Sequence, residues 1–336
     1  MNDIDFVITY VDGNDIEWQK EKSKYSPDEQ DNINSNRYRV WNNLQYLFRG
    51  IEVFAPWVRK VHFVTYGHLP AWLNTEHPQL NIVRHEQYIP QEWLPTFNNR
   101  CIELNLHRIS GLAEQFVYFN DDMFLLKSVS PEDFFVDGKP CDTAVLTASN
   151  LKLRKTLSEL HLAPFIDTAI INKYFNLREV VLKNPTKWFN FKYGLYNLRT
   201  LSEIFYRHFK GFVPFHLPYS YLKSTFEKIW EVEPEICKES SMHKFRCAMD
   251  INQWLMNYWQ FASGNFKPRK ANFGKWFQLY SIEDSLVAST AIHNHIYKVI
   301  CLNDMITTNE QDFSIISNNV NSALDSLLPK KSKFEK

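Results

Sequence analysis

A strongly apolar, β-branched run, residues 4–11, opens the chain and stops abruptly at Asp12-Gly13. This pattern is typical of a buried strand that ends in a turn. Three further runs in the first 120 residues share it: residues 61–66, 80–83 and 116–119. Because helical periodicity separates these runs, the sequence predicts an α/β fold, with a Rossmann-like, mostly parallel sheet flanked by helices.

Helical periodicity is clearest between the first two runs, where five apolar residues share one helical face: Val40, Leu44, Leu47, Ile51 and Phe54. The polar segment before them, residues 14–36, lacks such a pattern, and we expect it to be mobile. From residue 150 to about residue 230 the pattern is mainly helical, aromatic and basic. We therefore predict an α/β portion (residues 1–149), an additional mainly helical subregion (150–235) and a C-terminal portion (236–336).

Composition excludes some classes of protein. Lys and Arg total 38, as do Asp and Glu, so no overall positive field recruits nucleic acid. The five cysteines are widely spaced and include no Cys-x-x-Cys pair, which favours reduced thiols in the cytoplasm. The N-terminus lacks the features of a secretory signal, and no apolar stretch approaches the roughly 20 residues of a transmembrane helix. We expect a cytoplasmic protein.

Near the C-terminus, apolar residues at helical spacing precede three lysines: Phe313, Ile316, Val320, Leu324 and Leu327, then Lys330, Lys331 and Lys333. The simpler interpretation is a packed terminal helix with a solvated basic tail. The alternative is an anchor that lies on a membrane surface.

Two acidic turns at strand ends are candidate ligand sites, because ligands of open α/β sheets bind at the carboxyl ends of the strands. Asp121 and Asp122 directly follow one strand, and adjacent carboxylates can hold Mg²⁺ or Mn²⁺ against a diphosphate. Asp12-Gly13 follows another strand. Strand-ending Asp residues also cap helices and form turns, so a structural role is an equal alternative.

Polar residues elsewhere form a second set of candidates. Glu103 and His107 are four residues apart, which predicts a shared helical face that could meet a sugar or a phosphate. A surface salt bridge or a packed histidine also explains this pair. Downstream, His216 offers an imidazole that titrates near neutrality, and Arg246, four residues before Asp250, offers a fixed cation. Either could be structural.

The sequence segments around these residues resemble those of the Stealth family of bacterial capsular polysaccharide phosphotransferases. This family is related to the catalytic subunit of animal lysosomal-enzyme GlcNAc-1-phosphotransferase. Four blocks carry the resemblance, in the family's order: residues 4–15, 37–126, 216–250 and 300–304. Tyr10 stands in the first block where Trp is commoner, and Met305 follows the last block where an acidic or amide residue is common.

The resemblance implies a UDP-sugar donor, whose β-phosphorus is attacked by a hydroxyl of a polysaccharide or oligosaccharide acceptor. UMP would leave, and hexose-1-phosphate, such as GlcNAc-1-phosphate or a related hexosamine phosphate, would remain in a phosphodiester of a cell-surface polysaccharide. Peripheral association with capsule-assembly machinery at the inner membrane face is also implied. Residues 1–149 would bind the nucleotide sugar, residues 150–235 would face the acceptor, and residues 236–336 would complete the site.

Phosphoryl transfer chiefly needs positioning and neutralisation of charge, and this assigns a role to each candidate. The catalytic residues would be Asp121, Asp122, His216 as general base or acid, and Arg246 on a phosphate oxygen. The metal, Mg²⁺ or Mn²⁺, would be held by Asp121, Asp122 and Asp304. Eight residues would contact the nucleotide sugar: Asp12, Gly13, Asn98, Glu103, His107, Arg108, Asp250 and Asn303.

Two other functions are compatible with the sequence. A metal-dependent glycosyltransferase would break the anomeric C–O bond and release UDP in place of UMP. A glycan-binding protein would stack its aromatic residues on sugar rings without turnover. Within the phosphotransferase interpretation, direct transfer and a covalent Asp- or His-phosphosugar intermediate are both open.

Overall fold

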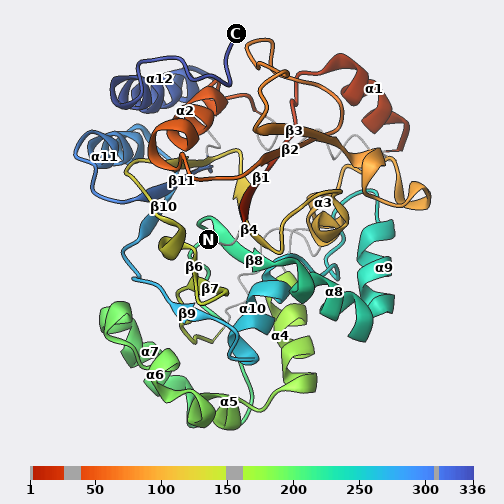
Figure 1. The fold of residues 1–336 in the computed structure, drawn as a ribbon, viewed down its shortest axis with the longest axis vertical. Helices are drawn as coiled ribbons and strands as arrows, with labels where there is room; N and C mark the ends of the chain where they lie inside the picture. Colours follow the sequence, from red (N-terminus) through yellow and green to blue (C-terminus); the bar gives the residue numbers. More distant parts are fainter. Residues whose placement is uncertain (1–2, 26–38, 149–161, 306–309) are drawn as a thin grey trace.

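A five-stranded sheet forms the centre of the molecule, in a computed structural model that describes residues 3–25, 39–148, 162–305 and 310–336. The strand order is β3-β2-β1-β4-β8 (Figure 1). Four strands are parallel: β1 (Ile4–Tyr10), β2 (Val61–Thr65), β3 (Leu80–Arg84) and β4 (Gln115–Asn120). The edge strand β8 (Tyr219–Leu222) is antiparallel to β4. The predicted α/β fold with a parallel-rich sheet is confirmed.

Both faces of this sheet are covered by helices, because side chains alternate along each strand and most of those on either face are apolar. In β1, Ile4, Phe6 and Ile8 belong to one hydrophobic core and Val7 to a second. The first core includes residues of α2 (Leu44–Phe54), α11 (Ile282–His293) and α12 (Glu310–Leu327). The second includes residues of α3 (Asn99–Leu104), α4 (Ala163–Tyr174), α8 (Lys223–Val232), α9 (Pro234–Met242) and α10 (Trp254–Ala262), as Figure 1 shows.

Two small sheets adjoin the central one. The first has the order β10-β11-β5, with β10 (Gly274–Leu279), β11 (Val299–Asp304) and β5 (Met123–Leu125). The second contains β6 (Phe135–Val136), β7 (Lys139–Asp142) and β9 (Lys267–Pro268). Since β5 follows β4 after only two residues, Asp121 and Asp122 form the turn that connects the central sheet to the first small one.

The middle of the chain is mainly helical. It contains α5 (Leu177–Lys183), α6 (Pro185–Trp188), the 3-10 helix η7 (Phe191–Tyr196) and α7 (Asn197–Glu203). Strand β8 also belongs to this part of the sequence and joins the central sheet through its pairing with β4. Short 3-10 helices occur elsewhere: η2 (His85–Gln87), η3 (Gln91–Trp93), η4 (Leu106–Arg108) and η5 (Pro131–Asp133).

The expectation of a mobile segment over residues 14–36 is wrong for its first half. Residues Ile16–Tyr25 form helix α1, whose Trp18 is buried and packs edge-on against Phe97 with ring centroids 5.8 Å apart. A helix with a single buried side chain gives no periodic signal, which explains the error. The remainder, residues 26–38, lies outside the described residues.

The C-terminal tail is only partly solvated: Lys330, Lys331 and Lys333 are exposed, as predicted, whereas Ser332 and Phe334 are buried. Helix α12 buries its apolar face, as expected, and the chain then folds back onto α2. Phe334 is buried, with its ring centroid 5.4 Å from that of Phe48. Glu335 accepts two hydrogen bonds of 2.9 Å from the guanidinium of Arg49. This planar, two-point ion pair fixes the chain end.

All five cysteines are free thiols, as predicted. None of the helices in the described part of the chain is both long and apolar enough to cross a bilayer.

Stability should fall below neutral pH because two buried histidines resist protonation. Burial lowers the pKa of both His85 and His107 to about 3. Below about pH 6.5 the unfolded chain therefore binds protons that the folded chain excludes. Each histidine can lower the free energy of unfolding by up to about 1.4 kcal/mol for each pH unit of acidification. Their stabilisation is complete above pH 6.5 and is lost progressively toward pH 3. Between pH 7 and pH 5, the free energy of unfolding measured with urea should fall less for His107→Asn than for the unmodified protein. An equal fall in the two proteins would contradict this account.

Candidate active site

The carboxyl ends of β1, β2 and β4 lie along one edge of the sheet, because these strands are parallel neighbours. Asp12 follows β1, His68 follows β2, and Asp121 follows β4. The backbone N–H of Asp12 donates a 2.7 Å hydrogen bond to Nε2 of His68. Burial, together with the charges of Asp12 and Asp121, raises the pKa of Tyr10 at the end of β1. Tyr10 is therefore near enough to both predicted acidic turns to feel their charges.

Asp122 sits at the junction of the two sheets. Its backbone carbonyl accepts a 2.8 Å hydrogen bond from the N–H of Leu302 in β11. Its Oδ2 accepts a 3.3 Å hydrogen bond from the thiol of Cys301, whereas Oδ1 is buried without a hydrogen-bond partner. A buried carboxylate oxygen without a partner is energetically costly, so Oδ1 is suited to receive a ligand.

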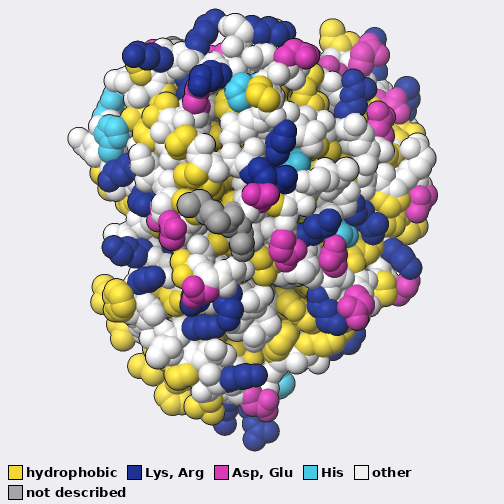
Figure 2. Space-filling model, viewed as in Figure 1, with side chains coloured by type: hydrophobic (Ala, Val, Ile, Leu, Met, Phe, Trp, Pro, Cys, Tyr) yellow, Lys and Arg dark blue, Asp and Glu magenta, His cyan; other side chains and the backbone are white. Residues whose placement is uncertain are grey.

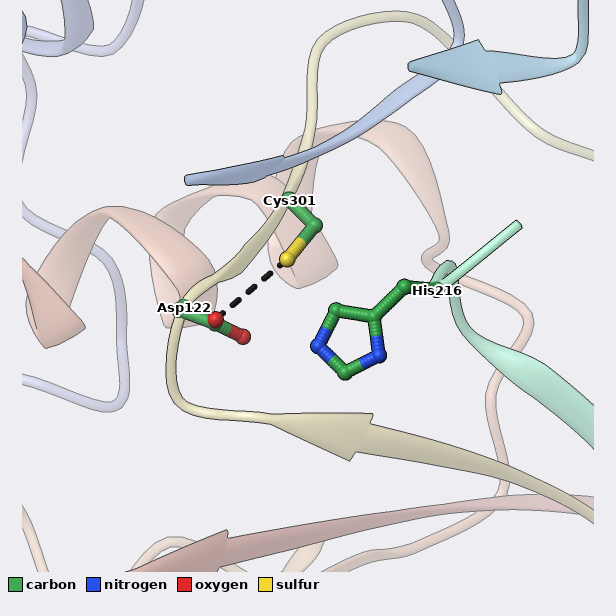
Figure 3. A group of neighbouring side chains, drawn as sticks. All are labelled: Asp122, His216 and Cys301. Carbon is green, nitrogen blue, oxygen red and sulfur yellow. Dashed lines mark hydrogen bonds between the residues drawn. The ribbon is translucent and has the colours of Figure 1, made fainter. Parts of the chain in front are cut away.

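His216 faces this carboxylate (Figure 3). Ligand-type atoms of Asp122, His216 and Cys301 all lie within 4.8 Å of one another. The histidine precedes β8 and has a φ of 48°, a left-handed conformation that is uncommon for a residue with a side chain. Burial lowers the pKa of His216, and the charge of Asp122 only partly offsets this effect. A neutral imidazole at neutral pH is a proton acceptor.

Cys301 was not among the residues singled out in the sequence. Burial and the neighbouring charge of Asp122 raise the pKa of its thiol, so the proton stays on sulfur. This thiol acts as a donor to Asp122 and is neither a thiolate nucleophile nor a thiolate ligand in this state. Its position in the 300–304 block, beside Asn303 and Asp304, was the available signal.

The residues present fit a hard divalent cation at Asp122. Burial, and then the charge of Asp122, raise the pKa of Asp121 to about 7, so these adjacent carboxylates repel each other. A cation would relieve this repulsion and would give Oδ1 of Asp122 a partner. Oxygen ligands of this kind suit Mg²⁺ or Mn²⁺, for which a thiol is a poor ligand.

Asp304, the third predicted metal ligand, already has partners. Its Oδ2 lies 3.4 Å from Nη1 of Arg39 and 3.3 Å from Nε1 of Trp41. Among the described residues, neither compact group of three ligand-type side chains includes Asp304. Asn303 adjoins it at the end of β11 and is half-buried. The roles of these two residues stay predictions.

A hydrogen-bond chain connects Arg246 to the acidic turn. Arg246, in the exposed loop between α9 and α10, donates from Nε to Oδ1 of Asn99 at 2.5 Å. Asn99 in turn donates to Oε1 of Glu103 at 2.9 Å. The Tyr118 hydroxyl is 2.9 Å from that oxygen and 2.7 Å from Oδ1 of Asn120, directly before Asp121. Burial raises the pKa of Glu103, which has a second oxygen without a partner.

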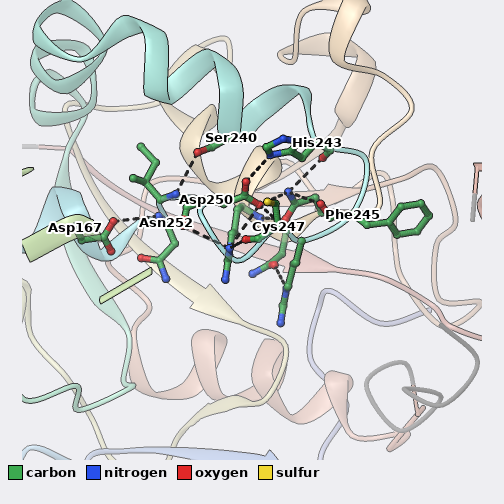
Figure 4. A network of polar contacts seen from close by, with 12 residues as sticks. Asp167, Ser240, His243, Phe245, Cys247, Asp250 and Asn252 are labelled. Carbon is green, nitrogen blue, oxygen red and sulfur yellow. Dashed lines mark hydrogen bonds and ion pairs between the residues drawn. The ribbon is translucent and has the colours of Figure 1, made fainter. Parts of the chain in front are cut away.

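Asp250 is the centre of a separate buried network (Figure 4). Its carboxylate accepts hydrogen bonds from Nδ2 of Asn98 at 3.0 Å, Nδ1 of His243 at 2.6 Å and the N–H of Cys247 at 2.9 Å. Arg100 lies 3.5 Å away as an ion pair. Both oxygens are occupied by protein donors, and Asn98 also caps α3. This geometry anchors the Arg246 loop to α3.

Replacing Asp250 with Ala should destabilise the protein strongly. The change removes the carboxylate that lies 3.5 Å from the buried guanidinium of Arg100, and it removes the acceptor for Asn98 and His243. Breaking a buried pair from one side typically lowers the free energy of unfolding by about 3–5 kcal/mol. Urea unfolding measures the effect. Asp137→Asn, at an exposed turn, is the matched control, and equal stability of the two variants would refute the network's structural role.

His107 and Arg108 lie apart from this group. The predicted helical face that Glu103 shares with His107 is wrong, because α3 ends at Leu104 and His107 lies in the separate 3-10 helix η4. Its ring packs 5.9 Å from those of Phe226 and Trp230. The guanidinium of Arg108 stacks 4.7 Å from the ring of Trp230. Both contacts are internal packing against α8.

Sequence comparison places this site in a known family. Two conserved regions of the Stealth proteins match: conserved region 1 over residues 2–30 and conserved region 2 over residues 37–142. Capsular polysaccharide phosphotransferase WcwK of Streptococcus pneumoniae is 39% identical over 341 residues, covering 100% of this chain and 99% of the relative. The chain belongs to the Stealth family.

Other Stealth relatives match over similar lengths. Exopolysaccharide phosphotransferase cps2G of Lactiplantibacillus plantarum is 36% identical, over 99% of this chain and 96% of its own length. Receptor polysaccharide phosphotransferase WefC of Streptococcus gordonii is 37% identical, over 99% and 98%. A solved structure of galactosyltransferase LgtC with donor and acceptor sugar analogues covers 98% of both chains, at 10% identity and a TM-score of 0.40. The predictions of the Stealth family and of an enzyme of the phosphotransferase class are confirmed.

Proposed function

We propose that this Stealth protein transfers hexose-1-phosphate from a UDP-sugar to a hydroxyl of a glycan acceptor, and releases UMP. The main support is the proximity of Asp122, which has a buried oxygen without a partner, to His216. The chain also aligns over its full length with a polysaccharide phosphotransferase. The proposed hexose is GlcNAc or a related hexosamine, and the product is a phosphodiester within a capsular or other surface polysaccharide.

The proposed reaction transfers one proton, forms one P–O bond and breaks another. The acceptor oxygen attacks the β-phosphorus, His216 takes the hydroxyl proton on its neutral imidazole, and the bond between the β-phosphorus and the bridging oxygen breaks. UMP leaves with the electron pair of that bond. Arg246 is exposed and donates a hydrogen bond to Asn99, and its planar guanidinium would bind a phosphate oxygen.

Asp122, with Asp121 beside it, would hold Mg²⁺ or Mn²⁺, which would neutralise charge on the diphosphate when bound. Cys301 would keep the Asp122 carboxylate oriented through its hydrogen bond. The Asp12-Gly13 turn would contact the nucleotide, in line with its position on the same sheet edge. Glu103 would contact the sugar, while Asn303 and Asp304 would complete the site from β11.

Product analysis tests this proposal. The purified protein is incubated with a panel of UDP-sugars, acceptor oligosaccharides and Mg²⁺ or Mn²⁺, and the released nucleotide is identified by chromatography. Acceptor-dependent UMP supports sugar-phosphate transfer. Acceptor-dependent UDP would instead establish a glycosyltransferase, and glycan binding without nucleotide release would establish a binding protein.

Chelation should abolish turnover. After dialysis against EDTA, UMP release should fall to the background rate, because Asp121 and Asp122 would face the diphosphate without a compensating cation. Adding Mg²⁺ or Mn²⁺ should restore the rate, whereas K⁺ at equal ionic strength should not. Full activity of the chelated protein would contradict the proposed role of these carboxylates.

A further inference from the structure

The lobe formed by residues 177–210, which carries α5, α6, η7 and α7, exposes an unusual amount of apolar surface. Of the 20 large hydrophobic side chains exposed in the described residues, eight lie here: Leu182, Phe191, Leu195, Tyr196, Leu198, Leu201, Phe205 and Tyr206. Hydrophobic side chains gather along the lower left of Figure 2, over these helices. Isolated exposed apolar residues are normal, but a cluster of this kind marks an interaction surface.

Part of this surface is a stripe on one helix. Leu198 and Leu201 are three residues apart on α7 and therefore lie on the same side, while Thr200 between them is buried. Phe205 continues the apolar surface just beyond the end of the helix. Leu198 is 64% exposed and Phe205 is 69% exposed. This helix therefore exposes leucines to solvent and buries a threonine, the reverse of the usual amphipathic arrangement.

The same lobe is basic. Residues 177–210 contain seven Lys and Arg against two Glu, whereas the whole chain has equal numbers of cationic and anionic residues. Lys183, Arg199 and Arg207 are exposed. The lobe therefore has a local positive potential that the neutral total charge conceals.

We propose that the 177–210 lobe docks the protein on a bilayer of anionic phospholipids. Apolar side chains enter the boundary between headgroups and acyl chains, and flanking basic residues bind the phosphates. A symmetric contact between two copies would bring two positive surfaces together, which disfavours a dimer through this face. This docking rests on the proposed function only for its purpose, which is to bring the enzyme to a membrane. The docking itself does not require the phosphoryl chemistry.

A groove extends from the lobe to Trp276. Its volume is about 840 Å³, and it is lined by residues 191–196 of the lobe and by residues that include Lys270, Lys275 and Trp276. None of the described residues that line it is acidic. The ring of Trp276 lies 5.0 Å from that of His216. Docking through the lobe would place a bilayer beside a basic groove that leads toward the proposed general base, where an acceptor held at the membrane could enter.

Vesicle flotation tests the docking. The purified protein is mixed with vesicles of phosphatidylcholine alone or with added phosphatidylglycerol, and the floated fraction is measured. We expect binding to the anionic vesicles only. Leu198→Ser/Leu201→Ser/Phe205→Ser, which changes no residue of the groove, should reduce the partition coefficient by at least about tenfold. Leu286→Ser/Val287→Ser on α11, with similar exposure, is the matched control and should bind normally.

A charge variant makes the test independent of the apolar substitutions. Lys183→Gln/Arg199→Gln/Arg207→Gln should lose the preference for anionic vesicles, as should the unmodified protein at high salt. Equal flotation of the apolar variant and the unmodified protein would overturn the proposal, and so would a lack of binding to anionic vesicles. A dimer that the apolar variant abolishes would identify a second copy as the occupant. UMP release with a soluble acceptor should persist in the apolar variant, so docking and chemistry can fail separately.

Discussion

Asp122→Asn should lower the rate of sugar-phosphate transfer by at least about 10³-fold, with little change in the far-ultraviolet circular dichroism spectrum. The substitution keeps the shape of the side chain but removes the charge that would hold the cation. It also puts an amide NH₂ group in the place of one carboxylate oxygen, either Oδ2, which accepts from the Cys301 thiol, or the unpartnered Oδ1. UMP release under saturating donor measures the effect.

Two controls make this result specific. Asp137→Asn, at an exposed turn between β6 and β7, should retain the full rate because its partner, Lys267, is also at the surface. The midpoint of thermal unfolding of Asp122→Asn should stay at or above that of the unmodified protein, since one of two repelling carboxylates has been neutralised. Retention of more than about a tenth of the rate would remove Asp122 from the mechanism.

Substituting His216 by Gln should lower the rate by about 10²–10⁴-fold, the usual contribution of a positioned general base. Glutamine can hydrogen-bond to the acceptor but cannot take its proton. The ring of His216 also packs 5.0 Å from Trp276, so the effect on acceptor affinity should be smaller than the effect on the maximal rate. Steady-state kinetics with varied acceptor separates these two quantities.

The exposed His293 of α11 provides the comparison for His216. His293→Gln should have unchanged kinetics, because its side chain lies outside the proposed site. If His216→Gln instead raised the KM for the acceptor and left the maximal rate intact, the residue would be a binding residue and the proton would have another acceptor.

Strand periodicity and turn chemistry predicted the central sheet because these signals are local. The runs of β1, β2 and β4 are mostly apolar and buried on both faces, as parallel strands covered by helices must be, whereas the edge strand β3 is partly exposed. Their order puts Asp12 and Asp121 on one edge, which is where the sequence analysis expected ligands. The approach of His216 to Asp122 followed only from the family resemblance, since 94 residues separate the two positions.

The errors arise where side chains compete with the backbone or act over long distances. Helix α3 ends early because Nδ2 of Asn105 donates to the carbonyl of Cys101 at 2.8 Å, which offers the backbone an alternative to another helical turn. That ending separates His107 from Glu103. The thiol of Cys301 reaches Asp122 through the pairing of β5 with β11, and no sequence period reveals such a contact.

The fate of the β-phosphorus tests the central claim most directly. A UDP-sugar that carries ³²P only in its β-phosphate is incubated with the protein, the acceptor and Mg²⁺, and the label is followed into glycan and nucleotide fractions. Sugar-phosphate transfer predicts that the label enters the glycan together with the sugar and that unlabelled UMP accumulates. Label retained in UDP while the sugar alone enters the glycan would contradict the account.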